Sequence, residues 1–555
     1  MPVISGAEIL IESLKKENVE VIFGYPGGKN IPIYNVLYDA PLKHVLTRHE
    51  QGAVHAADGY ARSTGKVGVC LATSGPGGTN LVTGLATAYM DSIPVVAFTG
   101  QVATTMIGKD AFQEADIRGI TMPVTKHNYI VTDIKDLARI IKESFHIART
   151  GRPGPVLIDM PIDVINASLE FDYSEEADLP GYNPVYELVP EELKKAAEMI
   201  NKAERPLIFA GGGMVLSGTA DNLRDFAESF RIPVTTSLMG LGSYPIDDEL
   251  SLGMPGMHGT RYANFAICET DLIIAVGVRF DDRVTGKIEA FAPKAEILHI
   301  DIDPAEINKN VETVISITGD AGEVLSELKS LLSKKDRTEW LKQIEKWKEE
   351  NPLYYENDGD EIKPQAVIQE LNELTEGKAV IVTEVGQHQM WAAQYYNYTI
   401  PRNFITSGGL GTMGFGLPAA IGAQLGRAGE LVIDISGDGS FQMNMQELAT
   451  IKENNLPIKV VILNNGTLGM VRQWQELLFE KRYSSTILSN PDFVKLAEAF
   501  AIKAIRIKNK EKLSEGLKEA LDYDGPVLID VVVAQEENVW PMVPAGAGLH
   551  EMIGG

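Results

Sequence analysis

The sequence predicts an α/β protein made of three domains, each built around a parallel sheet. Short apolar runs that end in Gly, Pro or Ser alternate with segments of helical periodicity, which is typical of parallel strands joined by helices. The 555 residues are too many for a single hydrophobic core. Two polar segments, 169–190 and 334–352, separate the predicted strands into three blocks.

The first block spans residues 1–170. Its predicted strands lie within 20–26, 67–75, 93–100 and 155–161. The segment 169–190 follows; it is acidic and contains prolines, so it is predicted to be a linker.

The second and third blocks repeat the alternation over residues 190–335 and 365–545. Strands are predicted within 205–213, 271–280 and 295–303 of the second block, and within 378–386, 430–439, 457–465 and 525–533 of the third. The charged stretch 334–352 between them is predicted to be a solvated connecting helix, and residues 546–555 are expected to form a C-terminal tail.

Composition restricts the partners and the compartment. The net charge of −26 argues against nucleic acid and against anionic membranes, both of which favour a basic face. Cys70 and Cys268 lie in apolar runs, which predicts buried thiols and no disulfide. Neither a signal peptide nor a membrane-spanning run is visible in the sequence, so a cytoplasmic location is expected.

Two stretches far apart in the chain share one layout. Residues 66–86 and 430–449 each read as a buried strand, a Ser-Gly-x-Gly bend and a helix. The repeat indicates either two related folds in one chain or the strand-to-helix turn that many α/β proteins contain.

The bend in the third block carries an acidic residue, Asp438, between two glycines at the end of a predicted strand. The next predicted strand ends in Asn464-Asn465, and the ends of parallel strands are where α/β proteins bind ligands. The Asp438 carboxylate, the Asn465 amide oxygen and a carbonyl at Thr467 form an oxygen set that suits Mg²⁺ with a phosphate. The simpler interpretation is a helix cap and a turn; the spacing of the two strands favours the metal.

Gly437-Asp438-Gly439 followed by Asn464-Asn465 resembles the diphosphate-binding signature of thiamine-diphosphate enzymes. More narrowly, almost the whole chain is similar to the catalytic subunits of acetohydroxyacid synthases. The similar stretches are FGYPGG, RHEQGAVHAADGYAR, SGPGGTN, DAFQEADI, GRPGPVLIDMP, GMHGTRYAN, RFDDRVTGK, GGLGTMGFGLPAAIGA, NNGTLGMVRQWQ and MVPAGAGLHEMI. The resemblance implies three doubly wound parallel-sheet domains: a pyrimidine-binding domain, an FAD-binding middle domain and a diphosphate-binding domain.

The resemblance also assigns the thiamine site. Glu50 corresponds to the glutamate that bonds the aminopyrimidine and activates the cofactor, and Met413 to the residue that supports its bent conformation. Without the family, Glu50 reads as a surface carboxylate and Met413 as a core residue. The cofactor-binding residues implied are Pro76, Asn80, Val385, Gly386, Gln387, His388, Gly411, Met413, Gly437, Gly439 and Ser440.

The substrates are expected at a second group of residues. Gln113, after Phe112, corresponds to a donor near the reacting carbonyl. Met470 and Trp474 lie four residues apart on a predicted helix and line the second-substrate pocket by resemblance, with Trp474 favouring 2-ketobutyrate. Arg283 corresponds to the arginine that receives that substrate's carboxylate. Without the family, core residues and a surface ion pair are the simpler interpretations.

The middle block resembles a flavin-binding domain whose FAD has a structural role. The implied contacts are Asp91, Arg152, Gly211, Gly212, Gly213, Met257, His258, Arg279, Asp281, Asp301, Ile302 and Asp320. Two departures from the family pattern lie near the expected active-site mouth: Lys29-Asn30 after Gly28, and Ile162 after the proline of DMP.

The predicted activity is that of a biosynthetic acetolactate synthase. Pyruvate is decarboxylated and its two-carbon unit joins a second 2-ketoacid, giving 2-acetolactate or 2-aceto-2-hydroxybutyrate on the route to branched-chain amino acids. The cofactors expected are thiamine diphosphate, Mg²⁺ and FAD; the partners are a second copy of the chain, as homodimer or homotetramer, and a small regulatory subunit. The alternatives are another thiamine enzyme, such as pyruvate oxidase or a simple decarboxylase, and a non-catalytic flavin-binding protein.

Overall fold

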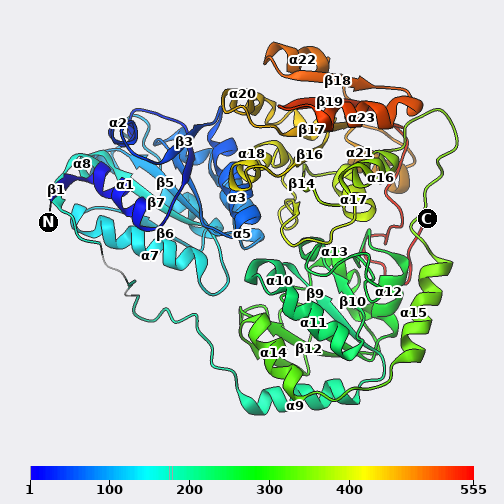
Figure 1. Cartoon of the computed structure of the whole chain (residues 1–555). Helices are drawn as coiled ribbons and strands as arrows, with labels where there is room; N and C mark the ends of the chain where they lie inside the picture. Colours follow the sequence, from blue (N-terminus) through cyan, green and yellow to red (C-terminus); the bar gives the residue numbers. More distant parts are fainter. Residues whose placement is uncertain (1, 174–175, 178, 555) are drawn as a thin grey trace.

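The computed structural model describes residues 2–173, 176–177 and 179–554. It contains three α/β domains, each with a parallel sheet between layers of helices. Figure 1 shows the first domain, in blue and cyan, beside the third, in yellow to red, with the green middle domain below them. The predicted fold class is confirmed. Parts of the predicted linker, residues 174, 175 and 178, and the chain ends at 1 and 555 lie outside the described residues.

The first domain has a six-stranded sheet. In spatial order the strands are β3 (Lys43–Leu46), β2 (Val21–Gly24), β4 (Gly68–Ala72), β5 (Val95–Gln101), β7 (Val156–Pro161) and β6 (His127–Ile130). Its helices are α1 (Gly6–Lys16), α2 (Ile31–Leu37), α3 (Glu50–Thr64), α4 (Pro76–Thr79), α5 (Val82–Met90), α6 (Ile117–Thr121), α7 (Leu137–Arg149) and α8 (Ile162–Asn166). The short strands β1 (Val3–Ser5) and β8 (Ser168–Glu170) pair antiparallel at its edge.

The third domain has a six-stranded sheet of the same topology. Its strands are, in spatial order, β15 (Phe404–Ile405), β14 (Val380–Thr383), β16 (Val432–Gly437), β17 (Lys459–Asn464), β19 (Val527–Val532) and β18 (Lys503–Ile507). Its helices are α16 (Pro364–Thr375), α17 (Gln387–Tyr395), α18 (Gly416–Gly426), α19 (Asp438–Phe441), α20 (Leu448–Glu453), α21 (Gly469–Leu478), α22 (Phe493–Ala499) and α23 (Leu513–Asp522).

The shared topology explains the two similar stretches in the sequence. In both sheets the first strand lies between the second and the third, and the sixth lies between the fourth and the fifth. Strands β4 and β16 are the third strand of their sheets, and each is followed at once by a short helix, α4 or α19. The first and third domains are therefore two copies of one fold.

The middle domain has a five-stranded parallel sheet. The strands are β10 (Val234–Thr236), β9 (Pro206–Ala210), β11 (Leu272–Val276), β12 (Glu296–Asp301) and β13 (Ile315–Thr318). Its helices are α9 (Pro190–Lys202), α10 (Gly212–Ser217), α11 (Ala220–Phe230), α12 (Arg261–Glu269), α13 (Asp282–Thr285) and α14 (Ala321–Leu331). Cys70 and Cys268 are both buried free thiols, as predicted.

Helix α15 (Thr338–Glu350) occupies the predicted connecting segment, but it is not solvated on all sides. Its Trp340 and Ile344 are buried against the middle domain, and Trp340 Nε1 donates a 3.0 Å hydrogen bond to the Pro206 carbonyl. The charged residues made the segment look polar throughout, whereas two apolar residues four positions apart form one buried stripe.

Helices α3 and α18 join the first and third domains through direct backbone contact. A side chain on Gly59 would lie 2.1 Å from the Ala419 carbonyl oxygen, and one on Gly422 would lie 1.8 Å from that of Ala56. Helix α3 begins at Glu50, where the preceding His49 caps it by accepting the Gln51 N–H. The domain contact therefore also fixes where Glu50 stands.

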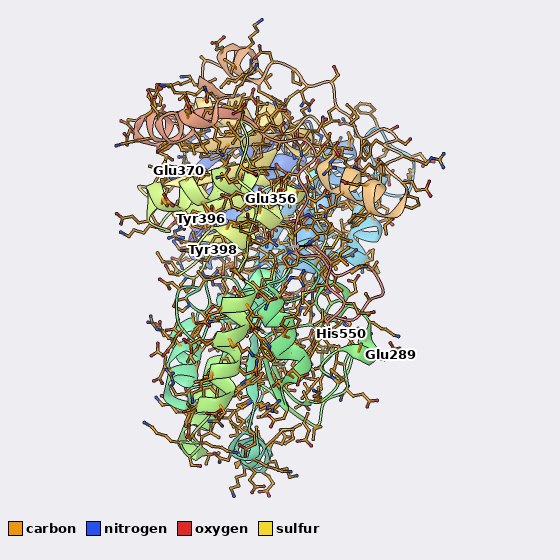
Figure 2. All side chains as sticks on the ribbon, turned by 90° about the vertical axis from the view of Figure 1, so that its right-hand side faces the viewer. Glu289, Glu356, Glu370, Tyr396, Tyr398 and His550 are labelled. Carbon is orange, nitrogen blue, oxygen red and sulfur yellow. The ribbon has the colours of Figure 1, made fainter. Side chains whose placement is uncertain are left out.

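The C-terminal segment crosses from the third domain to the middle domain. The Val543 N–H donates to the Met257 carbonyl at 2.8 Å, and the Lys287 N–H donates to the Ala547 carbonyl at 3.0 Å. Figure 2 shows His550 of this segment next to Glu289. Among the described residues, no helix combines the length and apolar character needed to cross a bilayer.

Candidate active site

One pocket at the carboxyl edge of the third sheet gathers most of the predicted thiamine and metal residues. It is lined by Val385, Gly386, Gln387, His388, Trp391, Met413, Gly437, Asp438, Gly439, Ser440, Leu463, Asn465, Thr467, Leu468, Gly469, Met470 and Val471. Most of these residues come from the ends of β14, β16 and β17 and from the turns and helices that follow them, and Met413 comes from the segment before helix α18. Gly411 lies close by, since a side chain on it would meet Val385 at 3.9 Å.

Asp438 is a buried carboxylate at the start of helix α19. The Asn490 amide donates to its Oδ2 at 2.6 Å, and burial raises the pKa of Asp438 to about 6. A raised pKa means that the site penalises the negative charge. A cation beside Asp438 would offset that penalty.

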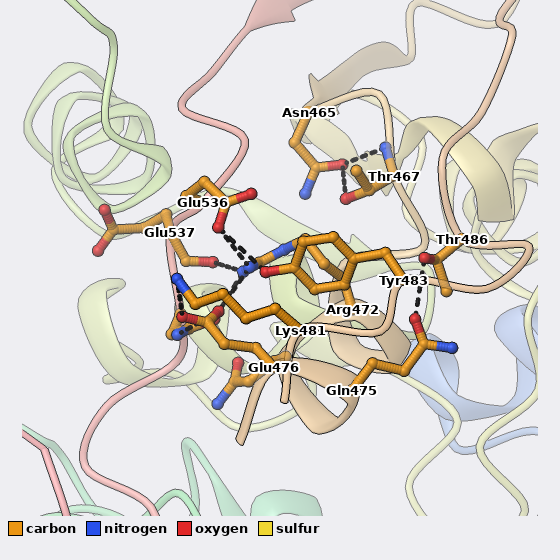
Figure 3. Close-up of polar contacts among 12 residues, drawn as sticks. Asn465, Thr467, Arg472, Gln475, Glu476, Lys481, Tyr483, Thr486, Glu536 and Glu537 are labelled. Carbon is orange, nitrogen blue, oxygen red and sulfur yellow. Dashed lines mark hydrogen bonds and ion pairs between the residues drawn. The ribbon is translucent and has the colours of Figure 1, made fainter. Parts of the chain in front are cut away.

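Asn465 and Thr467 stand beside Asp438 in the same pocket. Asn465 Oδ1 accepts hydrogen bonds from the Thr467 backbone N–H at 3.0 Å and from its hydroxyl at 3.1 Å (Figure 3). Neutral oxygens next to one carboxylate suit Mg²⁺ that shares its coordination with a phosphate. In the part of the chain that the structure describes, no three His, Cys, Asp or Glu side chains gather into a metal cluster. A metal here would depend on this mixed oxygen set.

His388 places an unpaired nitrogen at the pocket. Its ring is buried, Nε2 has no hydrogen-bond partner among the described residues, and burial lowers the pKa of His388 to about 3. The ring fills the space beside two glycines: side chains on Gly386 and Gly437 would come within 2.8 Å and 2.6 Å of it. An unsatisfied polar atom beside a helix N-terminus fits a bound anion such as a diphosphate.

Glu384, which was not predicted as a site residue, connects several elements of this pocket. It follows strand β14 and is completely buried. Its carboxylate accepts hydrogen bonds from the Ser440 hydroxyl at 2.7 Å and from the Gly414 and Leu417 N–H groups at 2.7 and 3.2 Å. An acidic residue directly after a buried strand, at the same sheet edge as Asp438, was the available signal.

Glu50 lies at the equivalent edge of the first domain. The Asn80 amide donates to Glu50 Oε2 at 2.9 Å, and a side chain on Gly77 would come within 3.3 Å of Oε1. The structure therefore brings together Glu50, Asn80 and helix α4, which begins at Pro76. Glu50 is not among the residues that line the Asp438 pocket, so one chain carries two separate half-sites.

Phe112 and Gln113 lie on a loop of the same half-site. Gln113 has a positive φ of 61° and packs its backbone against Gly75, where a side chain would come within 2.9 Å of the Gln113 carbonyl oxygen. Phe112 is 85% exposed.

The predicted substrate residues of the middle and third domains do meet. The Arg283 guanidinium lies 6.0 Å from the centre of the Trp474 ring, within the range of a cation–π contact. Arg283 also lines a second pocket with Met257 and the C-terminal residues 543–546. One exposed cation therefore stands between the tryptophan and the C-terminal segment.

The residues predicted to bind flavin fall into several local settings. Gly211 and Gly213 pack against Gly277: a side chain on Gly211 would lie 2.1 Å from the Gly277 carbonyl oxygen, and one on Gly213 would lie 2.7 Å from the Gly277 Cα. Gly212 begins helix α10. Asp301 ends strand β12 and Ile302 follows it, and burial raises the pKa of Asp301 to about 7. Asp281 and Asp320 cap helices α13 and α14 through backbone N–H groups. Their role in binding flavin stays a prediction.

Other residues that are predicted to bind flavin lie where two domains contact each other. Arg152 of the first domain pairs with Asp303 at 3.1 Å and Glu306 at 2.5 Å in the middle domain. His258 is buried, burial lowers its pKa to about 4, and its carbonyl accepts a hydrogen bond from Gln394 at 2.9 Å. Met257 lies beside Arg283, with Nη1 3.8 Å from its sulfur.

All three domains meet at Gly408 and Gly409. Asp91 accepts the N–H groups of both glycines, at 3.1 and 2.7 Å, and pairs with buried Arg62 at 2.9 Å. Arg62 also donates to the Thr406 carbonyl at 2.8 Å, and Arg279 of the middle domain donates to the Met90 carbonyl at 3.2 Å. This junction holds the segment that leads to Met413.

Known families match all three domains. Residues 4–120, 193–328 and 384–531 match, in order, "Thiamine pyrophosphate enzyme, N-terminal TPP binding domain", "Thiamine pyrophosphate enzyme, central domain" and "Thiamine pyrophosphate enzyme, C-terminal TPP binding domain". The class of protein that the fold and site define is thus that of the thiamine pyrophosphate enzymes.

Similar proteins narrow the class further. The acetolactate synthase large subunit of Pyropia yezoensis is 49% identical over 564 residues, with 99% of this chain and 95% of that protein covered. The acetolactate synthase isozyme 2 large subunit of Escherichia coli (strain K12) is 48% identical over 553 residues, with 99% of each covered. A probable acetolactate synthase large subunit of Methanocaldococcus jannaschii is 50% identical over 561 residues, covering 99% of this chain and 95% of that protein. The chain belongs to the acetolactate synthase large-subunit family, which confirms the resemblance seen in its sequence.

Proposed function

We propose that the chain is the catalytic subunit of an acetohydroxyacid synthase. It decarboxylates pyruvate and joins the remaining two-carbon unit to the carbonyl carbon of a second 2-ketoacid. The observation that carries the proposal is the pairing of half-sites: Glu50 stands at the sheet edge of one domain and Asp438 at the sheet edge of its structural copy. The Arg283–Trp474 contact would form a binding site for the second 2-ketoacid.

The third domain would hold the cofactor. Asp438, Asn465 and Thr467 would hold Mg²⁺, and His388, with the N-terminus of helix α19, would receive a diphosphate. Thiamine diphosphate, when bound, would supply a nucleophilic ring carbon and a cationic thiazolium ring that accepts the electron pair released by decarboxylation. Met413, which lines the pocket, would support the ring system. FAD would bind to the middle domain, with Asp301 at the end of β12.

Glu50 would assist the removal of a proton from the cofactor. Its carboxyl group, held by the Asn80 amide, would bond a ring nitrogen of the aminopyrimidine and favour the form that removes a proton from the thiazolium carbon. Gln113 would donate to the oxygen of the reacting carbonyl, and Arg283 would receive the carboxylate of the second 2-ketoacid. Trp474 and Met470 would form the wall against its alkyl group.

The active unit would be a dimer. Glu50 does not line the Asp438 pocket of its own chain, and Phe112 is exposed beside the Glu50 half-site. Both observations support a site in which Glu50 of one subunit meets Asp438 of another, in a homodimer or homotetramer. Because the similar proteins are named large subunits, a small regulatory subunit is also proposed.

Product analysis tests the proposed function. The purified chain is incubated with pyruvate, thiamine diphosphate, Mg²⁺ and FAD, and acetolactate, acetaldehyde and acetyl phosphate are measured. Acetolactate is the expected product. Acetaldehyde alone would indicate a simple decarboxylase, acetyl phosphate would indicate a pyruvate oxidase, and no turnover of any 2-ketoacid would favour a flavin-binding protein without catalysis.

A further inference from the structure

Directional polar contacts hold helix α21 (Gly469–Leu478), which carries Met470 and Trp474. The buried residues of this helix are Arg472 and Gln473, whereas Val471 is 44% exposed, Trp474 37% and Leu478 58%. Amphipathic helices usually bury an apolar stripe. Here Val471, Trp474 and Leu478 face outward, Met470 packs against the core, and the two fully buried side chains are polar.

Arg472 is the centre of these contacts (Figure 3). Its side chain is 0% exposed, and Nη1 pairs with Glu476 Oε2 at 2.7 Å, one turn further along the helix. Nη2 donates to the Glu537 carbonyl at 2.8 Å and to Asn538 Oδ1 at 2.6 Å. The Asn538 amide donates in turn to Glu476 at 3.1 Å, which closes a ring of three side chains.

Gln473, on the same face of helix α21, makes a second set of hydrogen bonds to this segment. Its Nε2 donates to the Val539 carbonyl at 3.1 Å, its Oε1 accepts the Val539 N–H at 2.9 Å, and Gln387 donates to the same oxygen at 2.9 Å. Arg472 and Gln473 thus bind the segment 537–539, which follows strand β19. Through Gln387 they also reach the pocket that holds Asp438.

The return segment after helix α21 depends on the same contacts. Tyr483 donates to Glu536 at 3.2 Å, and the Lys481 ammonium lies 3.5 Å from Glu476 (Figure 3). The Thr486 hydroxyl donates to Gln475 Oε1 at 3.1 Å. Because Arg472 Nη1 also lies 3.5 Å from Glu536, the return segment contacts both carboxylates that pair with this buried cation.

A buried guanidinium costs stability unless its partners are well placed, so packing alone does not account for Arg472. Apolar contacts are not directional and allow a helix to rotate and slide, whereas a planar guanidinium with fixed acceptors defines its rotation. One residue corresponds to about 100° around the helix axis, so a small rotation redirects every side chain on the opposite face. Trp474 is on that side, whereas Met470 lies next to Gln473, one turn earlier on the helix, and lines the Asp438 pocket.

We propose that Arg472 is a positioning residue for the choice of the second 2-ketoacid. It fixes the rotation of helix α21 and so holds Trp474 against Arg283 and Met470 in the wall of the pocket. This inference rests on the proposed function. It predicts that the loss of the guanidinium changes which 2-ketoacid is accepted more than it changes the use of pyruvate as first substrate.

A competition assay tests the role of Arg472. Wild type and Arg472→Met receive pyruvate and 2-ketobutyrate together, and the ratio of 2-aceto-2-hydroxybutyrate to 2-acetolactate is measured. Methionine keeps an apolar side chain of similar length and removes the guanidinium group that makes the hydrogen bonds. Because a well-fitted pocket discriminates one methylene by about 10- to 200-fold, we expect the ratio to fall at least about threefold. The affinity for thiamine diphosphate, measured by calorimetry, should stay within about twofold of wild type, since no bond from Arg472 reaches Asp438 directly.

Arg427→Met is the matched control. Arg427 lies at the end of helix α18 in the same domain and likewise contacts a carboxylate, Glu430, and the Asn403 amide oxygen, at 2.7 Å. It should lose stability without changing the product ratio. If Arg472→Met does not fold, Asn538→Ala removes one acceptor and should shift the ratio in the same direction.

The outcomes are distinct. A wild-type protein that forms no acetolactate would refute the proposed function itself. An active wild type whose product ratio is unchanged in folded Arg472→Met, or changed equally in Arg427→Met, would refute the positioning role alone. Arg472→Lys keeps the positive charge but lacks the planar guanidinium group. Its product ratio should lie between those of wild type and Arg472→Met.

Discussion

The Ser440 hydroxyl donates a 2.7 Å hydrogen bond to the Glu384 carboxylate, and this contact joins helix α19 to the end of strand β14. The same oxygen accepts the Gly414 N–H at 2.7 Å, one residue after Met413. Burial raises the pKa of Glu384 to about 7. One carboxylate therefore holds the two elements proposed to bind the diphosphate and to support the ring system.

Glu384→Gln is expected to weaken thiamine diphosphate binding about tenfold. The amide would keep one acceptor but would place its own N–H groups against those of Ser440 or Gly414, and losing a hydrogen bond to a charged group costs about 1.5–3 kcal/mol. Calorimetric titration measures the affinity. Asp159→Asn is the control, because Asp159 is a buried carboxylate of the first domain, bonded to Thr99 at 2.7 Å and Gln101 at 2.9 Å. Equal affinities in Glu384→Gln and wild type would refute the assignment.

Asp91→Asn is expected to destabilise the protein by about 1–3 kcal/mol, because it removes a charged partner of the buried Arg62 guanidinium, which keeps its ion pair with Asp58. Asp91 also holds Gly408 and Gly409, so the junction of all three domains should loosen. Differential scanning calorimetry without added cofactors measures the melting temperature. Glu228→Gln breaks the exposed pair with Arg224 and should change stability by less than about 1 kcal/mol. Similar shifts in both variants would contradict this view of the junction.

Mixing two inactive variants tests whether the active site lies between subunits. Glu50→Gln should lower turnover by about 10²–10⁴-fold, since it removes the proposed proton-transfer group. Asp438→Ala should abolish metal-dependent cofactor binding. If each site combines Glu50 of one chain with Asp438 of the other, random mixing restores one intact site in half of the dimers, or about a quarter of wild-type activity.

The readout is activity after the two variants are co-expressed, with each variant alone as the baseline. Activity that stays at the baseline, although mixed dimers are isolated through two affinity tags, would place both residues in a site within one chain. Since Glu50 and Asp438 are far apart in sequence and do not share a pocket in the structure, no single-variant assay makes this distinction.

The sequence identified the central strands of each sheet and missed the edges. Every predicted strand became an inner strand, such as β4 or β16, whereas β3, β6, β10, β13, β15 and β18 lie at the edges and were not predicted. Inner parallel strands are covered on both faces and read as continuous apolar runs. Edge strands such as β18, with only Ile507 buried, carry a mixed pattern that resembles a loop.

The residues of the candidate site could also be predicted only in part. Asp438 and Asn465 were predicted as neighbours because each follows a strand, so the topology of the sheet brings them together. The contacts of Arg472 with Asn538 and of Asp91 with Gly408 gave no local signal, because these partners lie 66 and 317 residues away along the chain. Long-range polar contacts of this kind depend on how domains and segments pack, which no motif within one element encodes.

His55 makes the contact between the first and third domains sensitive to acid. Its ring stands edge-on to Phe415 at 5.4 Å, neither ring nitrogen has a hydrogen-bond partner among the described residues, and burial lowers the pKa of His55 to about 3. An unfolded histidine binds its proton near pH 6.5. Between these two values the unfolded chain binds a proton that the folded chain does not, so stability falls as the pH falls below about 6.5.

Replacing His55 with Leu should reduce the loss of stability between pH 7 and pH 5 by about 2 kcal/mol, because each pH unit of differential proton binding corresponds to about 1.4 kcal/mol. The drop in melting temperature between these two pH values measures the effect. His550→Asn, which changes an exposed histidine of the C-terminal segment, should leave that drop as in wild type. Burial also lowers the pKa values of His44 and His258 to about 4 and that of His388 to about 3, so these residues keep part of the acid sensitivity in every variant. An identical drop in wild type and His55→Leu would show that His55 is already solvated before the domains separate.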